Sequence, residues 1–198
     1  MITYTLDWDW SAKCLKVITV TGYKPYEINI QQAEDQRIDF LKKAIEKQIL
    51  ALIDEGLQWV VVSGQMGVEL WAAEVTLQLK EEYPIQLALI PPFENQDNRW
   101  PDSYQLIYQQ IAEQADFYRP LYRGDYQGPY QYRAKNQWYV EQTDGCVLLM
   151  DEEYPGSTQY FYRIAQKQEN YPIYLITPSD IEEVIEEIRM MDPQYWQD

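Results

Sequence analysis

The pattern of hydrophobic and polar positions predicts a sheet whose strands are buried on both faces. Five short apolar runs, most of them rich in Val or Ile, are each flanked by polar or turn residues. Runs of roughly four to eight such residues indicate strands that other elements cover on both sides. The expected strands cover residues 15–21, 58–63, 85–90, 145–150 and 172–177.

The segments between these strands carry a helical period. Ile38, Ile45 and Leu52 belong to a row of apolar residues on one helix face, and Gly56 follows where that helix should end. Strands that alternate with helices of this length form a parallel, doubly wound sheet, because right-handed crossovers place helices on both faces. The expected helices cover residues 38–52, 68–79, 103–114, 130–141, 157–168 and 180–190.

The length of 198 residues fits one domain, which we expect to fill the whole chain. Residues 1–14 are predicted to be an N-terminal extension, either an added edge strand or an arm. Residues 115–129 should form a long loop with room for a short strand, and loops of this length are usually functional or mobile. No apolar run reaches the roughly 20 residues that span a bilayer, so we expect a cytoplasmic protein without a membrane span.

Composition and charge restrict the classes of function. The chain has 16 basic and 32 acidic residues, a formal net charge of −16, so duplex DNA and anionic membranes should repel it. It contains no histidine, which excludes Ser-His-Asp triads, Cys-His pairs and histidine-ligated zinc, and we expect no metal site. Cys146 lies in an apolar run and is interpreted as a buried free thiol.

Three loops that follow strands hold the candidate site residues. In an open parallel sheet, ligands bind outside the carboxyl ends of the strands, near the point where the strand order reverses. In the first of these loops Gly22 would allow a close turn, and Thr21 and Lys24 would donate hydrogen bonds to a phosphate. An ordinary turn with a solvent-exposed lysine is an equally good interpretation of this loop.

The second loop contains two glycines three residues apart, Gly64 and Gly67, directly before a helix. With Ser63 and Gln65 they form a candidate anion cradle of backbone N–H groups. The pattern is neither a Walker motif nor the Gly-x-Gly-x-x-Gly of dinucleotide-binding proteins. Glu69 falls in the first helical turn, and two interpretations stay open. In the first, it is a carboxylate that the helix dipole favours. In the second, it accepts hydrogen bonds from ribose hydroxyls or assists cleavage at a sugar, and it is then the candidate catalytic residue.

The third loop begins at Asp151 and reaches the start of the fifth helix. Gly156, Ser157 and Thr158 open this helix and offer a second phosphate site with two hydroxyl donors. A common Ser/Thr helix cap explains the same residues. Two glycine-bearing helix starts on neighbouring strands nevertheless favour a binding site over two unrelated caps.

Basic and aromatic residues cluster in one segment of this acidic chain. Four bases and one acid, Asp125, lie between positions 117 and 140, and aromatic residues are interleaved with them. Such a segment would face an anionic ligand and let a base stack on a ring, although core packing or surface exposure explains any single ring. Another loop, at Arg99-Trp100, would reach the cleft. The expected ligand wall consists of Arg99, Arg133, Lys135 and Asn136.

These segments together resemble the YpsA family. The resemblance covers about residues 16–178 and is carried by the segments 18–27, 63–74, 135–137, 144–151 and 171–174. The most specific of them reads Ser-Gly-Gln-Met-Gly-Val-Glu-Leu-Trp-Ala-Ala-Glu, in which Gly67 and Glu69 match the family's Gly-x-Glu signature. This match shifts the interpretation of Glu69 from helix capping towards function.

The YpsA family is part of the Rossmann-like SLOG superfamily, with the DNA-processing protein DprA and the LOG phosphoribohydrolases. The resemblance therefore implies a Rossmann-like fold and a nucleotide-derived ligand such as NAD or ADP-ribose. It also implies a link to cell division or stress in Gram-positive bacteria. LOG enzymes carry Pro-Gly-Gly-x-Gly-Thr-x-x-Glu after the fourth strand, whereas residues 155–161 here read Pro-Gly-Ser-Thr-Gln-Tyr-Phe. This departure argues against phosphoribohydrolase activity.

The preferred hypothesis is a sensor module that binds a nucleotide-derived ligand. Its phosphates would lie on the two glycine-bearing helix starts, and Glu69 would hold the ribose. One alternative is a hydrolase of an N-glycosidic or nucleotide bond, with Glu69 or Asp151 as general acid/base. The other is a protein-interaction module, for example with a partner in cell division, that uses the segment 117–140 or the Trp-rich N-terminus.

Overall fold

The strands form because short runs of Val, Ile and Leu can be buried on both faces of a parallel sheet. A computed structural model describes residues 15–191. The predicted extension at residues 1–14 lies outside the described residues. The strands are β1 (Val17–Gly22), β2 (Trp59–Val62), β3 (Gln86–Leu89), β4 (Phe117–Tyr118), β5 (Gly145–Leu149) and β6 (Ile173–Ile176).

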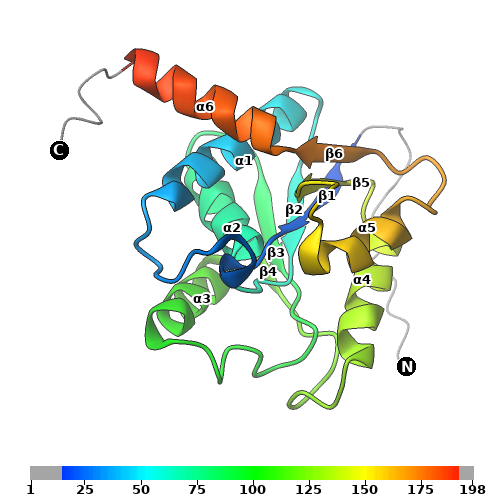
Figure 1. Ribbon diagram of the computed structural model, residues 1–198. Coiled ribbons are helices and arrows are strands. Elements are labelled where there is room, and N and C mark those ends of the chain that lie inside the picture. The colour runs from blue at the N-terminus through cyan, green and yellow to red at the C-terminus, as the bar shows by residue number, and fades with distance from the viewer. Residues whose placement is uncertain (1–14, 192–198) are drawn as a thin grey trace.

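The strands form one sheet in the order β4-β3-β2-β1-β5-β6, and every neighbouring pair is parallel (Figure 1). The order reverses between β1 and β5, where Thr19 lies beside Cys146 in the register. This confirms the predicted Rossmann-like, doubly wound sheet. The loops that follow β1 and β5 are therefore neighbours at the carboxyl edge of the sheet.

The helices follow the predicted apolar periodicity, since each must bury one face against the sheet. In the first helix the row that contains Ile38, Ile45 and Leu52 is buried. Two short 3-10 turns accompany the helices, η1 (Pro25–Ile28) after β1 and η2 (Gly156–Thr158) after β5. The helices are α1 (Arg37–Asp54), α2 (Val68–Leu79), α3 (Asp102–Gln114), α4 (Tyr130–Gln142), α5 (Gln159–Ala165) and α6 (Pro178–Met191).

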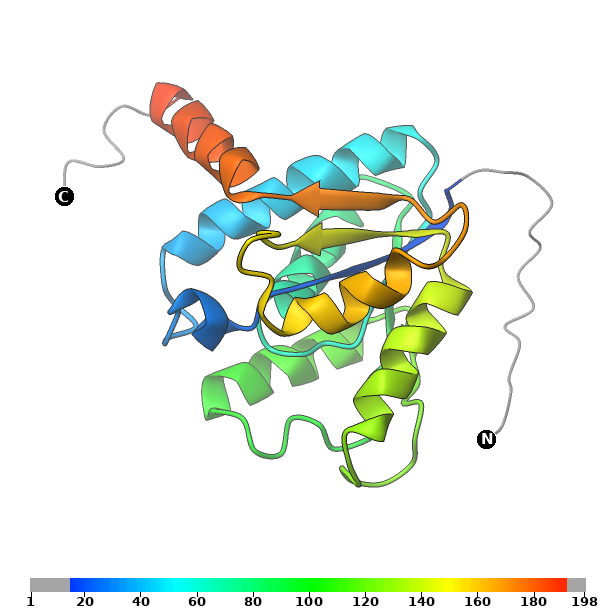
Figure 2. The same cartoon turned by 45° about the vertical axis from the view of Figure 1, so that its right-hand side comes forward.

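The helices cover both faces of the sheet (Figure 2). α1, α2 and α3 lie next to one another on one face, and α6 packs against α1. α4 and α5 contact each other on the opposite face. This is the arrangement that right-handed crossovers produce when the chain moves from β1 outward to β4 and then returns to β5.

Two local features refine the expectations from the sequence. The helix expected at residues 157–168 begins as the 3-10 turn η2 and continues as α5, which ends at Ala165. The long loop expected at residues 115–129 contains the two-residue strand β4, which pairs with β3 and extends the sheet by one strand.

The rest of this long loop is held against the segment that follows β3. Glu94 and Gly124 exchange two hydrogen bonds: the Glu94 N–H donates to the Gly124 carbonyl (3.1 Å), and the Gly124 N–H donates to the Glu94 carboxylate (2.7 Å). The Asn95 amide donates to the Asp125 carboxylate (2.7 Å). The two loops, residues 90–101 and 119–129, therefore form one wall beyond the ends of β3 and β4.

The core encloses the thiol that the sequence analysis assigned as free. Cys146 is fully buried in β5, and burial raises the pKa of its thiol to about 12. Burial thus disfavours the thiolate, which is the reactive form, and Cys146 is the buried free thiol that the sequence predicts. Within residues 15–191, no helix combines the length and the apolar character that crossing a membrane requires.

Candidate functional site

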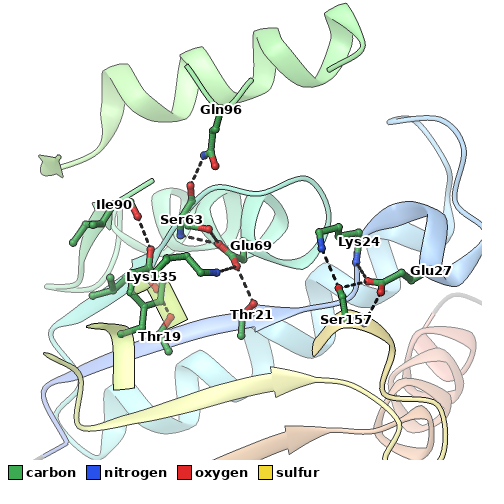
Figure 3. A network of polar contacts seen from close by, with 12 residues as sticks. Thr19, Thr21, Lys24, Glu27, Ser63, Glu69, Ile90, Gln96, Lys135 and Ser157 are labelled. Carbon is green, nitrogen blue, oxygen red and sulfur yellow. Dashed lines mark hydrogen bonds and ion pairs between the residues drawn. The ribbon is translucent and has the colours of Figure 1, made fainter. Parts of the chain in front are cut away.

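A buried carboxylate, that of Glu69 in the first turn of α2, is the centre of a polar network at the carboxyl edge of the sheet (Figure 3). One of its oxygens accepts from the Thr21 hydroxyl (2.8 Å) and from the Lys135 ammonium (3.2 Å). The other accepts from the Ser63 N–H (2.7 Å) and from the Ser63 hydroxyl. The network thus joins α2 to the carboxyl ends of β1 and β2 and to α4.

These contacts decide the ionisation of Glu69. Burial by itself raises the pKa of this carboxyl, but the Lys135 ammonium and the hydrogen bonds from Ser63 and Thr21 outweigh it, and the pKa lies below its ordinary value. Glu69 is therefore an ionised acceptor at neutral pH, and its oxygens face protein donors. Because a general acid must carry a proton and reach its substrate, this geometry favours an organising role over a catalytic one.

The ionised state predicts a pH dependence for the variant Glu69→Gln. Because the folded-state pKa is lowered, ionised Glu69 contributes stability above the ordinary value of 4.5, and the contribution is lost as pH falls through the lower folded-state pKa. Glu69→Gln should thus be less stable than the wild type at neutral pH, by an amount that shrinks in acid. Urea unfolding at pH 7 and at values below 4.5 measures this difference. A difference that grows towards acid would contradict an ionised Glu69.

The turn between β2 and α2 has backbone N–H groups that donate to no group within residues 15–191. Gly64 and Gly67 have φ angles of +70° and +99°, a region that favours glycine. Within the described chain, the N–H groups of residues 64–67 donate no hydrogen bond, whereas the next one, of Val68, donates to the Tyr23 carbonyl (3.1 Å). Consecutive unused N–H groups in such a turn are a geometry that binds anions.

Hydrogen bonds join the loops after β1 and β5 at the reversal point (Figure 3). The Glu27 carboxylate accepts from the N–H groups of Lys24 (2.8 Å) and Ser157 (2.6 Å) and from the Ser157 hydroxyl (3.1 Å). The Lys24 ammonium donates to the same hydroxyl (3.0 Å). Gly156 leaves the room for this contact, since a Cβ there would lie 2.7 Å from Glu27. Lys24 and Ser157, two of the residues predicted to donate to a phosphate, thus donate to groups of the protein itself.

A cavity of about 370 Å³ lies within the wall beyond β3 and β4. This volume is within the range of small-molecule sites. Three of its aromatic rings contact one another, with centroids 5.5 to 5.8 Å apart. Arg99 contributes an exposed guanidinium that makes no ion pair within residues 15–191. The lining residues are the aromatic Phe93, Trp100, Tyr126 and Tyr132 and the polar Asn95, Gln96, Asn98, Arg99 and Asp125.

Two contacts connect the cavity to the glycine turn. The Gln96 amide donates to the Ser63 carbonyl (Figure 3). Burial raises the pKa of the Tyr132 phenol, and a hydrogen bond with Gln65 acts against it. The cavity, the unused N–H groups of residues 64–67 and the Glu69 network are therefore adjacent parts of one edge of the sheet.

The structure separates the four residues of the predicted ligand wall. Lys135 is buried in its ion pair with Glu69, with both side chains 4% exposed. Arg99 lines the cavity. Arg133 lies on the exposed side of α4, and Asn136 is half-buried one position beyond Lys135. These residues therefore belong to different environments, although all of them lie near the same edge.

The predicted residues on the β1–β5 side have packing and hydrogen-bonding roles. A Cβ at Gly22 would lie 2.6 Å from the Leu149 carbonyl, so glycine lets the two strand ends approach. The Asp151 N–H donates to the Tyr23 hydroxyl (2.8 Å). Thr158 is buried, and its hydroxyl has no hydrogen-bond partner within the described chain.

Sequence reasoning missed two residues that organise this edge, Glu27 and Gln96. Glu27 accepts from the Lys24 N–H three positions before it, as the acid of a capping box does, but Lys24 is not the Ser or Thr that marks this motif, so the local signal is incomplete. Gln96 has no comparable signal, because its partner Ser63 lies 33 positions away.

Comparison with solved structures supports the fold alone. DprA from Streptococcus pneumoniae aligns with a TM-score of 0.55 and 15% identity, over 91% of this chain and 57% of that chain. DprA from Helicobacter pylori, which binds single-stranded DNA, aligns with a TM-score of 0.50 and 15% identity, over 89% of this chain and 74% of that chain. A shared fold at this identity does not imply a shared function.

Comparison of sequences identifies the family. A UPF0398 protein of Oceanobacillus iheyensis is 56% identical over 183 residues, which cover 92% of this chain and 100% of that protein. The UPF0398 protein YpsA of Bacillus subtilis is 42% identical over 177 residues, 87% of this chain and 98% of that protein. The family model YpsA, described as a SLOG family, matches residues 18–181. The chain therefore belongs to the YpsA family of SLOG proteins.

Proposed function

We propose that this protein binds a nucleotide-derived anion such as NAD or ADP-ribose and does not turn it over. The observation that carries the proposal is the aromatic cavity next to the glycine turn. A planar base would stack on Tyr126 or Tyr132, since every base presents a π-face to an aromatic ring. A phosphate would accept from the unused N–H groups of residues 64–67, and Arg99 would pair with a second one.

The state of the two candidate acid/base residues supports binding over hydrolysis. Glu69 is ionised, buried and surrounded by four protein donors. The Asp151 carboxylate accepts from the N–H of Glu153 (2.8 Å) within its own turn. A hydrolase needs a group that carries a proton next to the scissile bond, and the buried, ionised Glu69 does not meet this requirement. Asp151 does not line the cavity.

Calorimetric titration with NAD, ADP-ribose and AMP tests the proposal. At least one of these ligands should bind, and Tyr126→Ala should weaken it about tenfold, because stacking of a base contributes roughly 1–3 kcal/mol. Tyr126 is 50% exposed, so its removal should leave the fold intact. The matched control is Tyr160→Ala, which removes an exposed tyrosine of α5 that does not line the cavity.

Absence of binding at millimolar concentrations of every ligand would overturn the proposal, as would equal weakening by the two tyrosine variants. Release of nicotinamide or free base during the titration would instead establish a hydrolase. The panel should include a short single-stranded oligonucleotide, because the Helicobacter pylori neighbour binds single-stranded DNA. The link to cell division or stress stays a prediction.

A further inference from the structure

The N-terminal end of α4 (Figure 1) and the loop before it carry a second group of aromatic and basic residues, which do not line the cavity. This group consists of Tyr122, Arg123, Tyr130 and Arg133 and is called here the basic tyrosine surface. The rings of Tyr122 and Tyr130 pack edge to face, with centroids 5.7 Å apart, and Tyr130 is 40% exposed. None of the four residues lines the cavity.

The arginines of this surface differ from most exposed bases of the protein. Arg37, Lys43 and Lys47 each form an ion pair with a carboxylate. Arg123 and Arg133 are exposed and form none within residues 15–191. In a chain of net charge −16, these two guanidinium groups are therefore available to a partner from outside.

Two carboxylates lie close to Arg123 along the loops, and neither forms an ion pair with Arg123 or Arg133 within residues 15–191. Asp125 is the single acid between positions 117 and 140 and accepts from Asn95 (2.7 Å), and Glu94 accepts from the Gly124 N–H (2.7 Å). The fourth base of this segment, Lys135, is buried against Glu69. The exposed positive charge of the segment 117–140 therefore comes from its arginines.

We propose that the basic tyrosine surface docks an acidic segment of a partner protein. Arginine pairs with carboxylates through two parallel hydrogen bonds, and tyrosine and arginine are enriched in protein interfaces. A partner segment with a few carboxylates is complementary in charge to Arg123 and Arg133. A nucleic acid would bring a continuous row of phosphates against a chain of net charge −16, so electrostatics favour the protein partner.

Binding of a fluorescent oligoglutamate peptide, measured by anisotropy at low and high salt, tests this proposal. The wild type should bind the peptide, and the affinity should fall as salt rises. The double variant Arg123→Glu, Arg133→Glu should weaken binding about tenfold or more, because like charges then face each other. The matched control, Arg163→Glu with Lys167→Glu, makes the same charge change at exposed positions in and after α5.

The proposal is overturned if the wild type does not bind the peptide, if binding does not depend on salt, or if the two double variants weaken binding equally. It is also overturned if a single-stranded oligothymidine binds more tightly than the peptide and loses its affinity in the Arg123→Glu, Arg133→Glu variant. Titration of ADP-ribose against the same variants separates the two sites, and an equal loss of its affinity would make the surface part of the nucleotide site. If the double variant fails to fold, the affinity of Arg133→Ala for the peptide and the salt dependence of wild-type binding still test the proposal.

Discussion

Replacing Lys135 by methionine should lower the free energy of unfolding by about 3–5 kcal/mol. Lys135 and Glu69 are both 4% exposed, so the substitution leaves an ionised carboxylate in the interior without its counter-charge. The donors from Thr21 and Ser63 remain, but they are neutral groups. Methionine is the suitable replacement because its unbranched side chain fills a space similar to that of the lysine stem. Equilibrium urea unfolding measures the effect.

The matched control for this variant is Lys47→Met, which removes a surface ion pair. Lys47 lies 2.7 Å from Glu187, and the two side chains are 51% and 46% exposed, so solvent limits the loss to about 0–1 kcal/mol. Adding Glu69→Gln to Lys135→Met removes the unpaired charge and should recover part of the stability. Equal losses for Lys135→Met and Lys47→Met would show that the buried pair does not organise this edge.

Gly67→Ala should destabilise the protein by about 2–5 kcal/mol and displace the glycine turn. The φ of Gly67 is +99°, which costs an L-residue roughly 1–2 kcal/mol. The added Cβ would also lie 2.3 Å from the Tyr23 carbonyl, and relieving such overpacking costs about 1–3 kcal/mol. Because this carbonyl accepts from the Val68 N–H, alanine must push the loop after β1 away from the start of α2.

Gly124→Ala separates these two contributions. Gly124 also has a positive φ, +77°, but no atom lies within 4 Å of an added Cβ. Only the backbone term of about 1–2 kcal/mol should remain. Urea unfolding of both variants gives the comparison, and ADP-ribose titration should reveal weaker binding for Gly67→Ala. If Gly124→Ala lowers the free energy of unfolding as much as Gly67→Ala does, the contact with the Tyr23 carbonyl does not cause the destabilisation.

The fold could be predicted because its signals are local. The row of Ile38, Ile45 and Leu52 marks α1 almost to its ends, since helical periodicity relates residues one turn apart. Apolar runs separated by such helices imply a parallel sheet, because the crossover between parallel strands has a preferred hand. The weakest local signal belongs to β4, whose two residues are defined by pairing with β3.

The candidate site could be predicted only in part. Thr21, Ser63 and Glu69 meet because the carboxyl ends of parallel strands lie along one edge. The charge that holds Glu69 ionised comes from Lys135, 66 positions away, and no local pattern pairs these two residues. Whether Glu69 is an ionised acceptor or a proton-carrying acid therefore depends on which residues the tertiary structure packs around it.

The sequence by itself determined the parallel sheet, the positions of its helices and the glycines that turn the chain at the strand ends. These features depend on periodicity and on backbone conformation, which neighbouring residues specify. Only the tertiary structure decided that Glu27 occupies the donors of Ser157, and that open space lies beyond β3 and β4. Loop contacts such as that between Gly124 and Glu94 join residues 30 positions apart, and such pairs form only when the sheet has brought both loops to the same edge.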